Sequence, residues 1–205
     1  MNVKLVSYST PSPEWEAEGL NNLQDLIAFC AKVSNPSAQI NSATSEKLLN
    51  YLVKHKHWSP FEMVSACLEI ETTRDIAHQI VRHRSFSFQE FSQRYANPKE
   101  MGDMFEYAEA RLQDTKNRQN SIPTENVQLI HEWTDVQDQV IAATKKAYDW
   151  AIENGIAKEQ ARKVLPEGLT KTRLYMNGTI RSWIHYIDLR GANGTQLEHM
   201  QIAHA

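Results

Sequence analysis

The chain has 205 residues, with 22 lysines and arginines, 25 aspartates and glutamates, and a formal charge of −3 at pH 7. Hydrophobic residues make up 41% and charged residues 23%, which excludes a disordered tail and is typical of a water-soluble globular chain. The apolar runs are too short for a membrane span or a signal peptide, so we expect a cytoplasmic protein. Cys30 and Cys67 lack Cys-x-x-Cys spacing and are predicted to be reduced core residues.

The first third of the chain predicts a strand, two helices and a second strand. Alternation at 3–8 indicates a short strand. Apolar residues at three- and four-residue spacing predict helices at 21–33 and 44–54. From 61 to 72 the period changes to two, which predicts a long strand.

The remainder alternates between helical patterns and a polar excursion. Helical spacing returns at 74–84, and the polar segment 97–125 is interpreted as a long loop with a short helix near 104–112. Further helices are predicted at 135–154, 157–163, 179–189 and from 195 to the end, with a strand at 171–177. Strands and helices intermingle without a regular βαβ order, so we expect an α+β fold with a mixed sheet in a single domain over 1–205.

Glycine is scarce, which bears on how the chain could bind a nucleotide. Its seven glycines form neither Gly-x-Gly-x-x-Gly nor Gly-x-x-x-x-Gly-Lys-Ser/Thr. Any phosphate must then be held by side chains, chiefly arginines. The arginine positions are therefore the first place to look for a site.

The densest chemical signal is the segment from Arg82 to Tyr95. It contains Arg82, Arg84 and Arg94 in an otherwise slightly acidic chain, a pattern that suggests anion binding. Gln79 precedes Arg82 by three residues, so the two are predicted to share a helix face. By physics alone, a solvated basic face or a structural ion-pair cluster explains the same residues.

A specific motif distinguishes these interpretations. Arg82-His83-Arg84, seven further residues, Ser92 and then Arg94-Tyr95 resemble the signature of the flavin-dependent thymidylate synthases. The blocks His57-Trp58-Ser59-Pro60-Phe61-Glu62, Ala161 to Pro166, and Arg181 through His185 to Arg190 extend the resemblance in family order from about residue 44 to the end. Segment 97–125 matches no motif of the family.

The resemblance implies a reaction and its site. It implies formation of deoxythymidylate (dTMP) from deoxyuridylate (dUMP), with 5,10-methylenetetrahydrofolate as one-carbon donor and NADPH reducing the enzyme through FAD. The implied dUMP residues are Gln79, Arg82, Glu90, Ser92, Arg94, Arg162 and Arg190. The implied FAD residues are Ser59, Arg82, His83, Arg84, Glu90, Thr179, Arg181 and His185. The family is also a homotetramer with sites where subunits meet, so residues distant in sequence can come from different chains.

The residue chemistry agrees with this interpretation. A dianionic monophosphate suits guanidinium forks, while glutamine and serine can read the uracil edge. Arg190, the implied catalytic residue, cannot lose its proton, so it suits stabilising a uracil anion rather than acting as a base. No cysteine nucleophile is expected, and Ser92 lacks an adjacent base in the sequence.

Other interpretations remain for particular residues. His185 and His57 are each either site residues or structural histidines. A nucleic-acid module would explain arginines beside phenylalanines, but the net charge is negative. His55, His57, His78 and His83 could suggest a metal site, but they lack the spacing of metal ligands. A catalytically silent paralogue would lack one of the motif arginines, and this chain has all of them. We therefore expect no metal, nucleic-acid or membrane partner.

Overall fold

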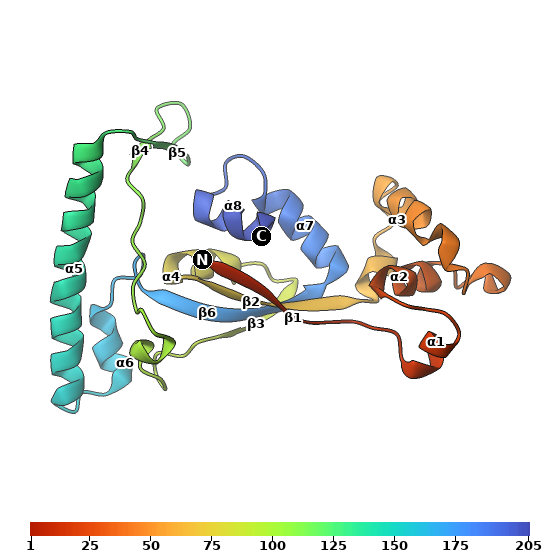
Figure 1. Ribbon diagram of the computed structural model, residues 1–205, viewed down its shortest axis with the longest axis horizontal. Helices are drawn as coiled ribbons and strands as arrows, with labels where there is room; N and C mark the ends of the chain where they lie inside the picture. Colours follow the sequence, from red (N-terminus) through yellow and green to blue (C-terminus); the bar gives the residue numbers. More distant parts are fainter.

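The computed structural model describes all 205 residues. The molecule is elongated, with α1, α2 and α3 at one end, α5 and α6 at the other, and the main sheet between them (Figure 1). The strands are β1 (Asn2–Tyr8), β2 (Ser65–Thr73), β3 (Phe86–Glu90), β4 (Arg111–Gln113), β5 (Ser121–Pro123) and β6 (Lys171–Thr179). The α-helices are α1 (Pro13–Ala17), α2 (Leu23–Ala31), α3 (Ser45–Lys54), α4 (Arg74–Ile80), α5 (Val127–Glu153), α6 (Lys158–Ala161), α7 (Ile180–Arg190) and α8 (Leu197–His204). Short 3-10 turns are η1 (Pro36–Ala38), η2 (Ser42–Thr44), η3 (Ser59–Glu62), η4 (Pro98–Met101) and η5 (Arg162–Val164).

The centre of the molecule is a four-stranded sheet in the order β1-β2-β6-β3. Every neighbouring pair in this sheet is antiparallel. The expected α+β class is confirmed, but the expected mixed sheet is wrong, because each strand runs opposite to its neighbour. A separate two-stranded ribbon joins β4 and β5.

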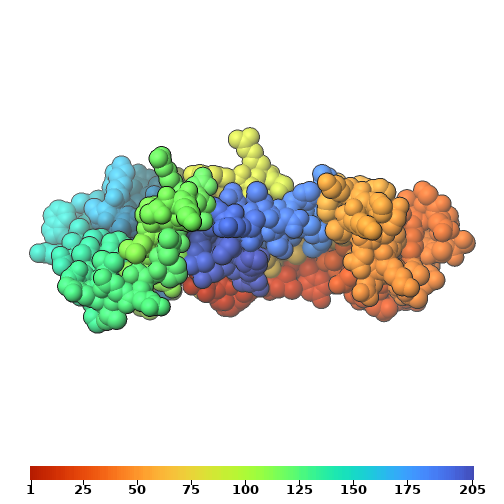
Figure 2. All heavy atoms as spheres, turned by 90° about the horizontal axis from the view of Figure 1, so that it is seen from above, coloured from red at the N-terminus to blue at the C-terminus, as the bar shows by residue number.

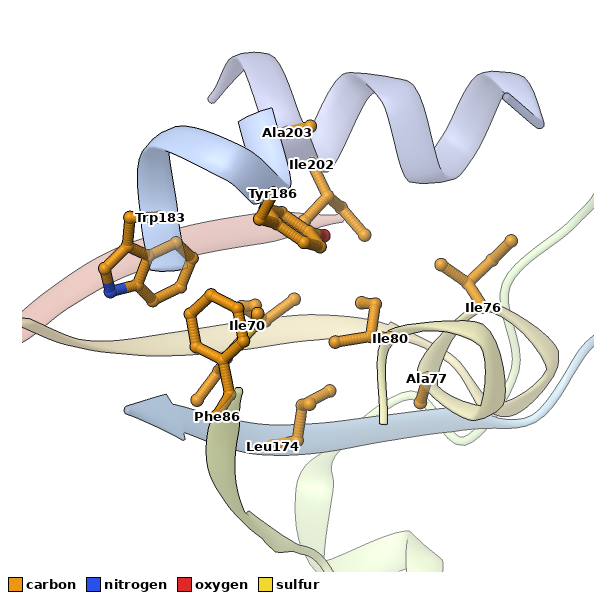
Figure 3. Packing of buried hydrophobic residues seen from close by; sticks show 11 residues of the cluster. Ile70, Ile76, Ala77, Ile80, Phe86, Leu174, Trp183, Tyr186, Ile202 and Ala203 are labelled. Carbon is orange, nitrogen blue, oxygen red and sulfur yellow. The ribbon is translucent and has the colours of Figure 1, made fainter. Parts of the chain in front are cut away.

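One face of the sheet carries the main core. Ile70 of β2 and Leu174 and Met176 of β6 are 1% exposed or less. They pack under helices α4, α7 and α8, which cover this face (Figures 1 and 3). The alternation that predicted the long strand therefore identified the buried face correctly, since Ala66, Leu68 and Ile70 all contribute to this core.

The opposite face of the sheet is polar. The Tyr175 hydroxyl donates to Glu69 at 2.9 Å, and Arg173 donates through Nε to Glu71 at 2.9 Å. The Arg173 guanidinium lowers the pKa of the Glu71 carboxyl. Cys67 also lies on this face and is half-buried, as is Cys30 in α2. The prediction that both cysteines are core residues is wrong, although both are free thiols and partial burial raises the pKa of each.

Smaller cores lie at the two ends of the elongated body (Figure 2). At one end Ile27, Leu52, Phe61 and Val64 join α2 and α3 to η3. At the other end, α5 packs through Ile141 and Tyr148 on Phe105 and Ala161. No helix is long and apolar enough to cross a membrane.

Strand β3 was not predicted, although Phe86-Ser87-Phe88 alternates. Phe86 lies opposite Gly178 of β6, and a Cβ at position 178 would lie 2.4 Å from the Phe86 ring. Only the bare backbone of a glycine leaves room for that ring. The helix predicted at 74–84 ends earlier, at Ile80, because the chain turns after it to enter β3.

Four further features differ from the sequence prediction. No helix forms near 104–112, because Phe105 makes a bridge with Thr170 and the backbone there is extended. Helix α5 starts at Val127 rather than at 135, capped by the Asn126 side chain, which accepts from the Leu129 N–H at 3.1 Å. The strand predicted at 61–72 begins only at Ser65, because residues up to Glu62 form η3, and α1 was not predicted.

Candidate active site

Helices α4, α7 and α8 bring a polar group together above the core. Ile76, Ala77 and Ile80 fix the buried side of α4, and Trp183 and Tyr186 do the same for α7. The polar side chains that meet there come from positions far apart in the sequence. They are Gln79, His83, Tyr186, Arg190, Gln196 and His199, and we call them the central group.

His83 and Arg190 are in direct contact. Arg190 Nε donates to His83 Nε2 at 2.9 Å, across 107 residues of sequence. Because a guanidinium only donates, His83 Nε2 must be the unprotonated acceptor, which leaves the proton on Nδ1. Burial first, and the Arg190 charge second, lower the pKa of His83. A neutral His83 thus holds one edge of Arg190 and leaves its terminal nitrogens free.

His199 connects two further members of the group. It is fully buried, and burial together with the charges of Arg190 and His83 lowers its pKa to about 4. Gln79 donates through Nε2 to Gln196 at 2.7 Å, so its Oε1 faces His199 Nδ1 at 3.3 Å. His199 Nδ1 therefore donates to Gln79, and Nε2 accepts from the Tyr186 hydroxyl at 3.0 Å. The neutral ring fixes the amide of Gln79 in one orientation.

Arg82 and Arg84 flank His83 and point away from this core. Both side chains are exposed, and neither belongs to any ion pair of the chain. The yellow segment that includes them protrudes from one long side of the molecule (Figure 2). Two unpaired guanidinium groups next to a neutral histidine form a surface suited to an anion.

A second group lies where α7 begins. The Thr179 hydroxyl accepts from the Ser182 N–H at 3.2 Å and caps the helix. Arg181 forms an ion pair with Glu62, and His185 packs edge-on against Trp58 at 4.7 Å between ring centroids. Arg181 and His185 thus face the same short turn, as their spacing predicted. Ser59, in that turn, lines a groove of about 390 Å³.

A third group lies near α6. Glu90 Oε1 accepts from Arg74 at 3.0 Å and from Thr172 at 2.8 Å. Arg94 pairs with Glu159 of α6 at 3.5 Å, and Arg162 follows that helix directly. Ser92 is exposed in the turn after β3.

The predicted site residues therefore fall into these three groups and the exposed pair Arg82 and Arg84. Gln79, His83 and Arg190 come together in the central group, while no hydrogen bond or ion pair joins that group to the residues at the start of α7 or to Glu90, Arg94 and Arg162. Sequence reasoning missed Tyr186, Gln196 and His199. Tyr186 and His199 lie on the buried faces of α7 and α8, where the sequence pattern does not distinguish them from ordinary core residues. Gln196 precedes α8 and gave no signal.

The fold is α+β, and the three groups consist of side chains from its helices, strands and turns rather than of a glycine-rich loop. The family described as "Thymidylate synthase complementing protein" matches residues 18–205. The chain belongs to this family, the flavin-dependent thymidylate synthases, which confirms the family identified from the sequence motif.

Similar proteins include a viral and a cyanobacterial member. A "Probable flavin-dependent thymidylate synthase" of Paramecium bursaria Chlorella virus 1 is 49% identical over 205 residues, covering 100% of this chain and 91% of that protein. The "Flavin-dependent thymidylate synthase" of Synechocystis sp. is 46% identical over 203 residues, covering 99% and 91%. The fold is similar to that of a solved UMP/dUMP methylase, PolB of Streptomyces cacaoi, bound with 5-Br dUMP. That likeness has a TM-score of 0.75 at 23% identity and covers 99% of this chain and 86% of PolB.

Proposed function

We propose that the chain methylates dUMP to dTMP as a flavin-dependent thymidylate synthase. Methylenetetrahydrofolate supplies the carbon, and NADPH supplies the reducing equivalents through bound FAD. The observation that carries the proposal is the contact between Arg190 and His83. It joins a residue expected to bind the substrate to one expected to bind the cofactor, and both side chains are half-buried. We also expect the protein to act in the cytoplasm.

The exposed arginines beside His83 and the group at the start of α7 fit a flavin. Arg82 and Arg84 are exposed and unpaired, so they are available to a diphosphate. Arg181 and the Trp58–His185 pair add a cation and aromatic edges suited to a planar ring. Bound FAD would supply hydride chemistry that no side chain of the chain can perform.

Arg190 would bind and polarise the pyrimidine. His83 occupies its Nε–H, so the two terminal nitrogens can donate side by side to the uracil edge. A fixed positive charge there stabilises the anion formed when N3 loses its proton. Gln79, oriented by His199, would donate or accept at the same ring without adding charge.

We propose that complete sites require several chains in a homotetramer. Glu90, Arg94 and Arg162 are tied to α4, β6 and α6, apart from Arg190 at the end of α7. The surface area supports assembly. A monomer of 23.6 kDa exposes roughly 9,800 Å², whereas this chain exposes 12869 Å². The excess is larger than the face that one subunit commonly buries in a stable interface, roughly 800 Å².

The test is a product assay on the purified full chain. FAD, NADPH, methylenetetrahydrofolate and dUMP are supplied, and dTMP is measured by mass, with each component omitted in turn. We expect dTMP only when all four are present. A purified protein that takes up FAD but forms no dTMP from the complete mixture would contradict the assignment, and one that binds no flavin would remove its cofactor.

A further inference from the structure

The start of helix α8 is held by a residue from segment 97–125, which matches no motif of the family. Arg111 in β4 forms an ion pair with Glu198 in the first turn of α8, across 87 residues of sequence. The two side chains are only 12% and 25% exposed. The β4–β5 ribbon that carries Arg111 lies between α5 and α8 (Figure 1). A segment without a recognised role is thus tied to the helix that contributes to the central group.

In this ion pair each charge depends on the other. Arg111 Nη1 and Glu198 Oε2 are buried and have no further partner in the chain. Both residues line a cavity of about 220 Å³ at the end of β2, and Gln196 lines it too. Removing one member of such a pair leaves an uncompensated charge in a buried place, which is costly. The pair therefore holds the first turn of α8 close to β4.

Few other contacts hold the first turn of α8. Gln196, which precedes the helix, makes no side-chain cap. The buried residues of α8 begin only at His199. From outside α7, α8 and the turn between them, only Gln79 and Arg111 form hydrogen bonds with residues 195–198. The position of this turn therefore depends on the ion pair.

Both ends of the Gln79 amide are bonded to this part of the chain. Its Nε2 donates to Gln196 at 2.7 Å, and its Oε1 accepts from His199 at 3.3 Å. His199 is fully buried and is also bonded to Tyr186, whereas Gln196 is exposed. One hydrogen on Nε2 and one lone pair on Oε1 remain for a nucleotide. The direction in which Gln79 presents them depends on where the start of α8 lies.

We propose that Arg111 is a positioning residue for the nucleotide site, acting through Glu198 and Gln196 on the amide of Gln79. Arg111 does not touch the nucleotide itself. The inference rests on the proposed function, because that proposal places Gln79 at dUMP. It gives segment 97–125 the role of fixing the helix start that orients this amide.

The first experiment measures dUMP binding to the FAD-loaded full chain by titration calorimetry. Arg111→Met frees the first turn of α8, so dUMP binding should weaken about tenfold, the loss expected for one misplaced hydrogen-bonding group. Arg118→Met is the matched control, because Arg118 is exposed between β4 and β5 and forms no ion pair. It should leave dUMP affinity within about twofold of the unchanged chain.

The second experiment repeats the comparison in a Gln79→Ala background. There Arg111→Met should change dUMP affinity by less than about twofold, because the amide through which Arg111 acts is gone. A merely structural role would weaken binding whether or not Gln79 is present. A full further loss of about tenfold in this background would therefore overturn the proposal.

A third variant keeps the test valid if Arg111→Met alone fails to fold. Arg111→Met combined with Glu198→Met removes both charges and keeps apolar volume, so it leaves no unpaired charge in the fold. Circular dichroism and thermal unfolding check that it folds. It lacks the ion pair and should bind dUMP as weakly as Arg111→Met. Binding as tight as that of the unchanged chain would show that the pair does not position Gln79.

The outcomes separate this inference from the proposed function. An unchanged chain that takes up FAD but binds no dUMP overturns the proposed function and this inference with it. An unchanged chain that binds dUMP, with Arg111 variants that bind it equally well, overturns only the positioning role.

Discussion

Arg190 is held by its Nε–H on His83, which leaves its two terminal nitrogens able to donate as a fork. Replacing it by lysine keeps the charge but removes the fork. We expect Arg190→Lys to lower dUMP-dependent turnover about a hundredfold, corresponding to roughly 3 kcal/mol of lost transition-state stabilisation. FAD binding should survive.

The rate of the chemical step is measured as single-turnover oxidation of the reduced flavin. The affinity for dUMP is measured separately by titration. A variant that binds dUMP weakly but reacts at the normal rate when saturated would show that Arg190 only holds the nucleotide.

The buried His199 predicts a pH dependence of stability. Its pKa is about 4 in the folded chain, below the ordinary value near 6.5, so the unfolded chain binds the proton more readily. Stability is therefore complete above about pH 6.5 and is lost as pH falls toward 4. We expect about 2 kcal/mol less free energy of unfolding at pH 5 than at pH 7.5 from this group.

His199→Gln removes the titrating ring, so urea unfolding of this variant should show a smaller difference between the two pH values. An equal pH dependence in both proteins would mean that His199 is not neutral in the fold. Burial also lowers the pKa of His83. Because His83 is present in both proteins, it lowers the stability of both as the pH falls.

At the scale of elements, the close approach of β3 and β6 depends on Gly178. A Cβ there would lie 2.4 Å from Phe86, and Phe86 is itself packed on Trp183 at 4.7 Å between centroids. Gly178→Ala should destabilise the chain by about 1–3 kcal/mol through overpacking.

Gly168→Ala is the control for this change, because nothing lies within 4 Å of its added Cβ and its φ is not positive. Thermal unfolding of both variants measures the difference. Equal midpoints would show that Phe86 moves aside without cost.

At the scale of the whole molecule, the separation of the site groups predicts complementation between inactive variants. Arg190→Lys damages the central group, and Arg94→Ala damages the group near α6. If one site takes these groups from different chains, a refolded equal mixture restores intact sites at about one quarter of the normal number. The measurement is dTMP formation by the mixture against each variant alone. No gain on mixing would place both groups of a site in the same chain.

The sequence by itself determined two things, which are the local secondary structure and the family. Alternation identified β1 and β2, and helical spacing identified α2 and α3, because a buried face leaves a periodic pattern in neighbouring residues. The strand β6 and the helices α7 and α8 were also predicted. The spacing of Arg82, His83, Arg84, Ser92 and Arg94 identified the family.

Contacts between distant residues were decided by the tertiary structure alone. The contact of His83 with Arg190 and the His199 bridge from Tyr186 to Gln79 join α4, α7 and α8, which only the packed core brings together. Strand β3 needed the space that Gly178 leaves, and the extended backbone at Phe105 needed Thr170. A sequence pattern records how each residue relates to its neighbours along the chain, whereas these features depend on residues up to 120 positions apart.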